Sequence, residues 1–403
     1  MTGQERIVRK RRVFYIPGYD PIPPRRYREL YRKEGKAQAD LCEYGLSLIE
    51  RPKSDRFGWA VEAQVDGASV EADFEVLVWS DIVRDSMDAS ILRTYQQLVR
   101  TAWLYIASGA LGRLVRLRKG PVIAALYPVG MLLIQLLMAV TVGVIVWRLM
   151  AILGVFGSIA GAALGLALVL GILSWFRGKD GRFFAHYLMH DYAFSASENG
   201  AYPEALETRL DDFADAVADA ARADVDEVLV VGHSSGAHLA ISVLADLLRA
   251  GRVEADRVSL LTLGQVVPMV SFLPNADRLR ADLRLMAAQD NIAWVDVSAP
   301  GDGCTFALCD PVAVSGVAPA DKKWPLVLSA AFTKTLQPDT WKALRWRFFR
   351  LHFQYLCAFD RPGDYDYFQI TAGPRSLRNR YAGRAASRSR IETPVSKFTS
   401  VAA

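Results

Sequence analysis

Cysteine is scarce in this chain of 403 residues, which contains only Cys42, Cys304, Cys309 and Cys357. None of them belongs to a C-x-x-C pair, and their density is far below that of a disulfide-stapled scaffold. The spacing therefore excludes a thiolate zinc site and a disulfide framework. It favours reduced thiols in a cytoplasmic compartment, and we expect neither a metal nor a cofactor.

The chain also lacks a strong excess of charge of either sign. Its formal net charge is +5, which is too small to indicate nucleic acid as a partner. The basic N-terminus, MTGQERIVRKRR, is followed only by the apolar run Val13–Ile16 before a proline. That run is too short for the apolar core of a secretory signal peptide, so nothing predicts export by cleavage.

One long segment has almost no charge at all. Residues Pro121–Phe176 are nearly all apolar and contain a single charged residue, Arg148. A bilayer core about 30 Å thick needs about 20 helical residues, so this segment is long enough to cross a membrane twice. We expect a transmembrane hairpin with its turn near Trp147–Leu149.

The packing and orientation of this hairpin also follow from the sequence. Gly157, Gly161 and Gly165 recur at four-residue intervals, which gives the second span a smooth face for close helix packing. Basic residues gather outside the spans, namely Arg113, Arg116, Arg118, Lys119, Arg177, Lys179 and Arg182. The excess of positive charge predicts that the N- and C-terminal parts are both cytoplasmic, in a multi-pass membrane protein with two spans.

A second segment indicates chemistry. Val228–Ala240, VLVVGHSSGAHLA, begins as a β-branched run and passes through Gly232-His233-Ser234-Ser235-Gly236 into the apolar helical stretch Ala237–Leu248. A strand, a sharp turn and a helix in this order would hold the Ser234 hydroxyl on an exposed corner. The amide of Ser235 would open the helix and point at a developing oxyanion.

This motif resembles the nucleophile elbow of the α/β-hydrolase superfamily, and GHSSG is similar to the form found in lipases, esterases and thioesterases. The resemblance implies that Ser234 is the nucleophile and that Gly232 and Gly236 are the elbow glycines. It also implies an oxyanion hole made of the amides of Tyr19 and Ser235, because in this superfamily the loop after an early strand supplies the second amide.

A serine hydroxyl needs an imidazole to take its proton, and the imidazole needs a carboxylate to fix its tautomer. In the resembling fold, acid and histidine follow the serine along the chain. Asp302 lies in a glycine-rich loop directly after the expected strand Ile292–Val297 and is the preferred acid, with Asp310 and Asp296 as alternatives. His352 is the only histidine after these acids, so it is the predicted base.

Strands alternate with helices along most of the chain. Strands are expected over Val13–Ile16, Trp59–Val65, Ala68–Val70, Phe74–Trp79, Val228–Val231, Arg257–Leu263 and Ile292–Val297, and helices over Arg26–Glu50, Ser86–Lys119, Pro203–Ala223, Ala237–Leu248 and Ala276–Ala288. This alternation predicts an α/β fold, with a mostly parallel sheet covered by helices on both faces and interrupted by the transmembrane hairpin.

The expected organisation is therefore a hydrolase-like domain in two parts, residues 1–120 and 177–374, with the hairpin 121–176 inserted between them. Trp324–Phe349 is rich in Trp and Phe and shows no clear last strand, so we interpret it as a lid or a membrane-docking element. The tail 375–403 carries arginines among small residues, which predicts a basic, disordered segment.

Taken together, the resemblance implies a membrane-anchored serine hydrolase that cleaves carboxylic esters, acyl lipids among them, through an acyl-enzyme intermediate. The expected partners are a lipid bilayer and an acyl ester or lipid substrate. The same machinery serves acyl thioesterases and acyltransferases, and a hydrolase-like domain without activity can act as a membrane interaction protein. These remain the alternatives.

Overall fold

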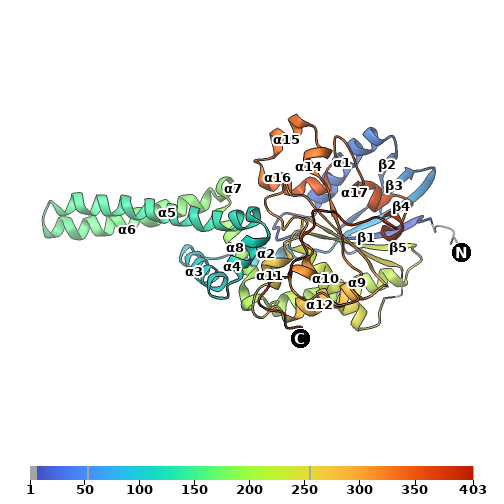
Figure 1. Ribbon diagram of the computed structural model, residues 1–403. Coiled ribbons are helices and arrows are strands. Elements are labelled where there is room, and N and C mark those ends of the chain that lie inside the picture. Colours follow the sequence, from blue (N-terminus) through green and yellow to red (C-terminus); the bar gives the residue numbers. More distant parts are fainter. Residues whose placement is uncertain (1–6, 52–53, 254–255, 403) are drawn as a thin grey trace.

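A single eight-stranded sheet forms the centre of the molecule in the computed structural model, which describes residues 7–51, 54–253 and 256–402. The strands are β1 Lys10–Ile16, β2 Gly45–Ile49, β3 Gly58–Val65, β4 Ala68–Val76, β5 Glu227–His233, β6 Val258–Leu263, β7 Ala293–Ser298 and β8 Leu326–Ser329. Their order is β2-β3-β4-β1-β5-β6-β7-β8 (Figure 1). β3 pairs antiparallel with both β2 and β4, and the six neighbouring strands β4, β1, β5, β6, β7 and β8 are parallel to one another. This mostly parallel sheet confirms the predicted α/β class.

Helices cover both faces of this sheet (Figure 1). On one face lie α9 Glu204–Arg222, α10 Gly236–Arg249 and α12 Asp277–Ala288, and on the other lie α1 Arg25–Cys42, α14 Phe332–Thr335, α16 Phe348–His352 and α17 Tyr367–Ala372. Alternate residues of β1 serve the two layers, because successive side chains of a strand point to opposite faces. Phe14 and Ile16 pack with the first layer, and Val13 and Tyr15 with the second.

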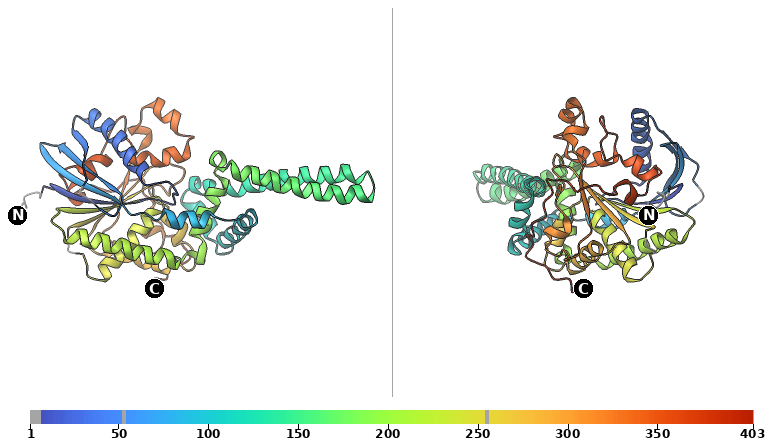
Figure 2. Two further views of the ribbon diagram at one scale, coloured as in Figure 1. Left: turned by 180° about the vertical axis from the view of Figure 1, so that it is seen from behind. Right: turned by 45° about the vertical axis from the view of Figure 1, so that its right-hand side comes forward.

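Two long helices project from this domain as an antiparallel pair, α5 Lys119–Ala151 and α6 Val155–Gly178 (Figures 1 and 2). Both are long and apolar enough to cross a membrane, and most of their apolar side chains are exposed. The turn lies at residues 152–154 and not near Trp147–Leu149 as expected. Trp147 and Arg148 continue the helix, and the chain reverses at Gly154, whose φ of +87° suits glycine.

Glycines hold the two helices close together, as expected. A Cβ on Gly165 would lie 2.6 Å from the carbonyl oxygen of Gly143, and a Cβ on Gly161 would lie 2.6 Å from the Cβ of Met150. Neither contact is compatible with a larger side chain. The small residues therefore set the separation of the helices, which is how small-residue faces pack in lipid.

Shorter helices connect the sheet to the base of the projecting pair. They are α2 Ser80–Met87, α3 Ile91–Ala107, α4 Ala110–Leu117, α7 Asp180–Phe183 and α8 Ala185–Ser195. The expected helix Ser86–Lys119 is thus interrupted after Met87 and at Gly109, where φ is +76°. The remaining short helices are η1 Ser197–Gly200, α11 Val267–Ser271, α13 Pro311–Val314, α15 Pro338–Leu344, η2 Phe353–Leu356 and α18 Leu377–Arg380.

Two edge strands differ from the expectations. The helix predicted to reach Glu50 ends at Cys42, where Glu43 takes a left-handed φ of +57°, and the chain continues as β2. Within Trp324–Phe349, for which no clear last strand was expected, β8 pairs in parallel with β7. Both strands are short, and neither is a fully buried apolar run: the residues of β2 alternate between exposed and partly buried, and only the two central residues of β8 are buried.

The basic tail 375–403 was expected to be disordered, but the structure shows it attached to the domain. Backbone hydrogen bonds attach it to the domain, from Ser387 N to Val327 O at 2.8 Å and from Ile391 N to Leu308 O at 2.7 Å. Further along, the Arg280 guanidinium donates to Ser400 O at 2.8 Å. Main-chain contacts, together with a few packed side chains such as Ile391 and Val395, hold the tail, so a composition poor in large apolar residues does not reveal its order.

The order of the strands also locates a crevice. After β1, the chain forms β2, β3 and β4 on one side of β1. It then crosses to the other side of β1, where β5 pairs with β1 and β6 pairs with β5. Parallel sheets bind ligands at the carboxyl ends of the strands where the connections diverge in this way. In this chain that point lies between the ends of β1 and β5, next to Tyr19 and Ser234.

Candidate active site

Ser234 occupies a sharp turn between β5 and α10. Its φ of +58° lies in the left-handed region, which is unusual for a residue with a side chain and is a form of strain found at functional turns. The turn is held from behind, because Ser234 N donates to Leu263 O of β6 at 2.9 Å. Ser234 is only partly buried and directly follows the last residue of β5, so it lies at the end of the sheet.

Neighbouring atoms come so close to the backbone around this turn that three positions require glycine. A Cβ on Gly232 would lie 2.6 Å from Gly236 O, and a Cβ on Gly236 would lie 2.1 Å from Ile16 O. Across the crevice, a Cβ on Gly18 would come within 2.9 Å of the Cβ of Ser234. The loop after β1 therefore packs directly against the serine.

Two backbone donors near this serine have no acceptor. Within the described ranges, neither Tyr19 N nor Ser235 N has a hydrogen-bond partner, although the two residues are only 3% and 5% exposed. Buried N–H groups are nearly always paired in folded proteins. Two unpaired donors on either side of Ser234 are the arrangement that an oxyanion hole requires.

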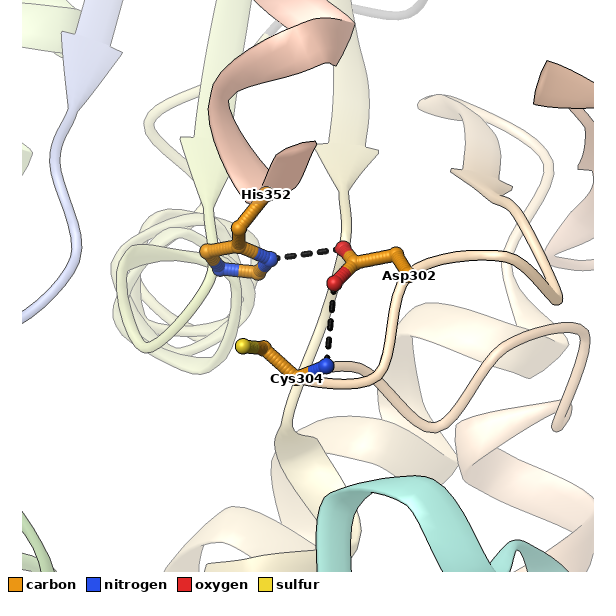
Figure 3. A group of neighbouring side chains, drawn as sticks. All are labelled: Asp302, Cys304 and His352. Carbon is orange, nitrogen blue, oxygen red and sulfur yellow. Dashed lines mark hydrogen bonds and ion pairs between the residues drawn. The ribbon is translucent and has the colours of Figure 1, made fainter. Parts of the chain in front are cut away.

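Asp302 and His352 meet at the same end of the sheet (Figure 3). His352 Nδ1 lies 2.7 Å from Asp302 Oδ2, and Asp302 Oδ1 accepts from Cys304 N at 2.9 Å. Tyr355 donates to Asp302 Oδ2 at 3.1 Å and accepts from Ala299 N at 3.0 Å. Both members of the pair are buried, so the carboxylate fixes the orientation of the imidazole.

The imidazole of His352 lies beside the serine turn. Its Cε1 would lie 3.2 Å from a Cβ on Gly264. Gly264 directly follows Leu263, whose carbonyl oxygen accepts the hydrogen bond from Ser234 N. No hydrogen bond joins the Ser234 hydroxyl to His352 in the described ranges. A side-chain movement is therefore needed to form one, and catalytic hydrogen bonds often close only when substrate binds.

His233 supports this geometry from beneath. Its Nε2 donates to the carbonyl oxygen of His352 at 3.0 Å, and its Nδ1 faces the Tyr15 hydroxyl at 3.4 Å. Burial, together with the neighbouring His352, lowers the pKa of His233 to about 3. His233 is therefore neutral near pH 7 and acts as a hydrogen-bonded support for the His352 backbone.

The two alternative acids have other partners. Asp296 lies inside β7, where it accepts from the Thr262 hydroxyl at 2.6 Å, and burial raises its pKa to about 7. Asp310 caps α13 by accepting from the backbone of Val312, and it forms an ion pair with Lys322. Of the three candidate acids, only Asp302 contacts His352.

Some residues near the pair were not anticipated. Tyr355 lies three residues after His352, and nothing in the sequence indicated its contact with the acid. Cys304, Asp302 and His352 are the one described group of potential metal ligands, with ligand atoms within 4.8 Å of one another. Both Asp302 oxygens and His352 Nδ1 already have hydrogen-bond partners, so a metal would have to replace those contacts.

Asp191 of α8 is another unanticipated neighbour, and no sequence motif indicated it. It lines a cavity of about 10 Å³ together with Tyr19, Ser235 and His238. This volume holds about one water molecule, so side chains must move to admit an acyl chain. Burial of the carboxyl raises the pKa of Asp191 to about 7, and the nearby His352 offsets part of that rise.

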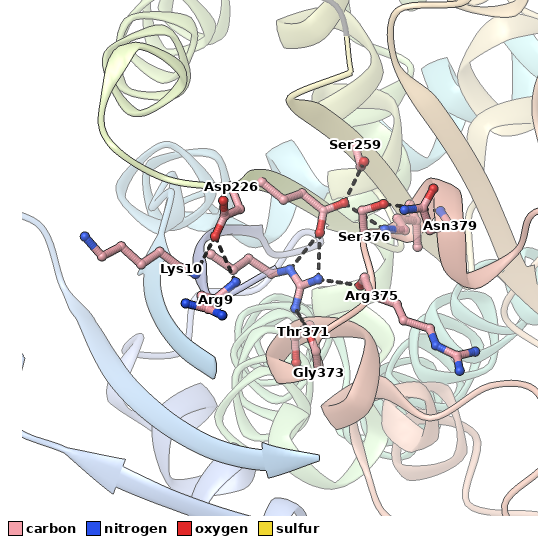
Figure 4. A network of polar contacts seen from close by, with 12 residues as sticks. Arg9, Lys10, Asp226, Ser259, Thr371, Gly373, Arg375, Ser376 and Asn379 are labelled. Carbon is pink, nitrogen blue, oxygen red and sulfur yellow. Dashed lines mark hydrogen bonds and ion pairs between the residues drawn. The ribbon is translucent and has the colours of Figure 1, made fainter. Parts of the chain in front are cut away.

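A buried ion pair holds β1 and β5 together at the opposite end of the sheet, beside Ser259, Gly373 and Arg375, which are labelled in Figure 4. Arg11 and Glu227 are paired across the two strands, with Arg11 Nε donating to Glu227 Oε2 at 2.7 Å, and both side chains are almost fully buried. Arg11 also donates to Gly373 O and Arg375 O, and Glu227 accepts from Ser259. This network keeps the strands that carry Tyr19 and Ser234 in register.

Glu227→Ala is expected to lower the free energy of unfolding by about 3–5 kcal/mol, because it leaves the Arg11 charge buried without a counter-ion. Urea unfolding of the detergent-solubilised protein measures this change. The matched control is Asp224→Ala, which removes the exposed partner of Lys10 and should leave the midpoint unchanged. Equal midpoints for both variants would contradict a structural role for the buried pair.

Comparisons of the chain with models of protein families, with curated proteins and with solved structures gave no match. The geometry described above is therefore the basis for any statement about function.

Proposed function

We propose that this chain is a membrane-anchored serine hydrolase of the α/β-hydrolase type that cleaves carboxylic esters. The observation that carries the proposal is the convergence, at one end of the sheet, of the Asp302–His352 pair and the left-handed Ser234. The two unpaired N–H groups beside Ser234 add the donors that the reaction needs. These groups come from four separate segments, namely the loop after β1, the turn after β5, the loop after β7 and the end of α16. Packing of the elbow alone therefore does not account for them.

In the proposed reaction, His352 Nε2 removes the proton from the Ser234 hydroxyl as its oxygen attacks the ester carbonyl. Asp302 holds Nδ1 and stabilises the imidazolium that forms. The amides of Tyr19 and Ser235 bind the oxyanion of the tetrahedral intermediate. His352 then gives its proton to the departing alcohol, and a water molecule activated by the same imidazole hydrolyses the acyl-enzyme.

The position of the site favours esters that partition into membranes. The base of the projecting helices contacts the loop of the acid, because a Cβ on Gly120 would lie 3.3 Å from the Cα of Gly303. Arg118, at the start of α5, donates to Ala307 O in the segment that follows that loop. A hairpin that crosses a bilayer would hold the crevice near the lipid surface, where acyl lipids are concentrated.

Labelling with a fluorophosphonate probe tests the proposal, because such probes phosphonylate only an activated serine. We expect labelling of the wild-type protein and none of Ser234→Ala. Ser235→Ala is the matched control, since it removes the neighbouring hydroxyl and keeps the backbone donor. A well-folded wild-type protein without labelling would instead favour the interaction protein. Once labelling is established, a panel of esters, thioesters and acyl acceptors separates the esterase from a thioesterase or acyltransferase.

The raised pKa of Asp191 leads to a prediction about pH. Its carboxyl is neutral below about pH 7 and becomes an anion above it. Because it lines the cavity beside Tyr19 and Ser235, the anion would repel the developing oxyanion. The ratio of kcat/KM of Asp191→Asn to that of the wild type should therefore rise as pH increases from 6 to 9.

The control for this titration is Asp296→Asn. Asp296 also has a pKa near 7, but its carboxylate binds Thr262 within the sheet. Its substitution should leave the shape of the pH–rate profile unchanged. A ratio that stays flat for Asp191→Asn would mean that the Asp191 charge does not act on the reaction.

A further inference from the structure

Helix α3 carries a stripe of exposed apolar side chains. Leu92, Val99, Trp103 and Ile106 are 70%, 66%, 72% and 62% exposed. Their spacing of seven, four and three residues puts them on one face of the helix, within roughly 40° of a common direction. An exposed stripe of this kind marks an interaction surface, since a soluble helix normally turns its apolar face inward.

The charges on α3 indicate the kind of partner. Arg93 and Arg100 are exposed and lie on one flank of the stripe, and the helix contains no acidic residue. An apolar stripe with a large aromatic side chain and flanking arginines is typical of helices that lie in a membrane interface, where arginines meet lipid phosphates. We favour lipid over a protein partner, because α3 itself packs, through Tyr95, against the base of the exposed apolar helix pair.

A hydrogen bond fixes the height of α3 along the projecting helices. The Tyr95 hydroxyl donates to Leu132 O of α5 at 2.9 Å. From Leu132 to the end of α5 at Ala151, the helix rises about 28 Å, which is close to the thickness of a bilayer core. If the tip of the pair reaches the far boundary of the core, α3 lies at the near boundary.

We propose that α3 lies in the headgroup region of the near leaflet, with its apolar stripe among the acyl chains and its arginines at the phosphates. The opposite face of α3 packs on α8 through Leu98 and Met189, and α8 carries Asp191 of the candidate site. The leaflet therefore sets the position of the crevice, and the substrate is an acyl ester resident in that leaflet. The surface assignment rests on the proposed membrane crossing, and the substrate class also rests on the proposed hydrolase function.

A second exposed apolar pair lies across the base of the hairpin. Trp346 and Phe348 are 72% and 48% exposed, and they belong to the segment around α15 and α16, on the other side of the projecting helices from α3 (Figures 1 and 2). A Cβ on Gly303, in the loop of the acid, would touch the ring of Phe348 at 3.4 Å. Apolar side chains thus flank the hairpin on both sides.

Photocrosslinking to lipid tests the surface without any need for activity. A benzophenone amino acid replaces Trp103, Ile145 of the projecting pair or Leu41 of α1, each in full-length protein in vesicles of phosphatidylcholine and phosphatidylglycerol. All three side chains are exposed, so the fold should tolerate each change. We expect lipid adducts at 103 and 145 and none at 41. Adducts at 145 alone would overturn the proposal for α3, and no adduct at either position would overturn the membrane crossing on which it rests.

A kinetic experiment tests the substrate class separately. The double variant Val99→Glu/Trp103→Glu should hydrolyse a long-chain diacyl ester in the same vesicles at least about 10-fold more slowly than the wild type. The reason is that charge replaces two apolar side chains that the proposal places among the acyl chains. Hydrolysis of a water-soluble short-chain ester by this variant should match the wild type, as should both activities of Leu41→Glu. Equal losses on both esters would overturn the role of α3 in reaching the lipid. A wild type inactive on both esters would instead refute the hydrolase function and leave the crosslinking result to decide the surface.

Discussion

Ser234→Ala is expected to lower kcat for ester hydrolysis by about 10⁶-fold, because the acyl-enzyme then cannot form and only the binding and oxyanion contacts remain. The change removes one hydroxyl from a partly exposed position, so the fold should persist. Hydrolysis of a chromogenic ester by the detergent-solubilised protein measures the effect.

The same experiment tests whether the three side chains act together. If Ser234, His352 and Asp302 form one unit, Ser234→Ala/His352→Ala should be no slower than Ser234→Ala alone, because the effects of such residues do not add. Ser235→Ala should retain most of the activity. A large loss in Ser235→Ala combined with a small loss in Ser234→Ala would contradict the assignment of the nucleophile.

Replacing residues 137–171 by a short Gly-Ser turn is expected to move the protein from the membrane fraction to the soluble fraction after carbonate washing. The change removes most of the exposed apolar surface of α5 and α6, and a bilayer-spanning helix is in effect irreversibly inserted. It keeps the base of the hairpin, including the contacts of Leu132 with Tyr95 and of Gly120 with Gly303.

Membrane contact by α3 alone would be reversible and sensitive to salt, so carbonate should release the shortened protein. Sedimentation of the shortened protein with membranes after that wash would place the anchor elsewhere. Fluorophosphonate labelling of the released protein is the control for folding, because it requires an intact Ser234 and His352.

Much of the fold could be predicted because its signals are local. The β-branched run before Gly232 reads as a strand buried on both faces, and all residues of β5 are indeed buried. Strands were expected over Trp59–Val65 and Ala68–Val70, and the Asp66-Gly67 pair between them is a typical hairpin turn, across which β3 and β4 indeed pair. The segment Pro121–Phe176 could be recognised as a pair of long apolar helices from the absence of charge alone.

The site could be predicted only in part. The elbow has a sequence motif, and His352 follows from chain order in the resembling family. Asp302 was preferred, but Asp296 and Asp310 stayed as alternatives, because the choice depends on which carboxylate the fold brings to His352. Asp191 carries no motif, and its importance arises only when α8 packs beside the crevice.

The remaining differences come from contacts that join distant parts of the chain. β2 is an edge strand of five residues, none of which is buried, so its sequence carries little of the apolar signal that identifies a core strand. The tail after Arg375 is held by backbone hydrogen bonds, for example from Ile391 N to Leu308 O, and by a few apolar side chains, such as Leu377 and Tyr381, that pack in the core. Backbone hydrogen bonds are available to nearly every residue type, and for that reason composition cannot report them.

The insertion of α5 and α6 between β4 and β5 has a consequence for synthesis on the ribosome. The nascent chain delivers β1 to β4 first, and both projecting helices emerge before β5 exists. During that interval the edge of β1 that later pairs with β5 has no neighbour, and an open strand edge can pair with other chains. Glu227, the counter-ion of Arg11, arrives with β5, so one pairing event both closes that edge and neutralises its buried cation.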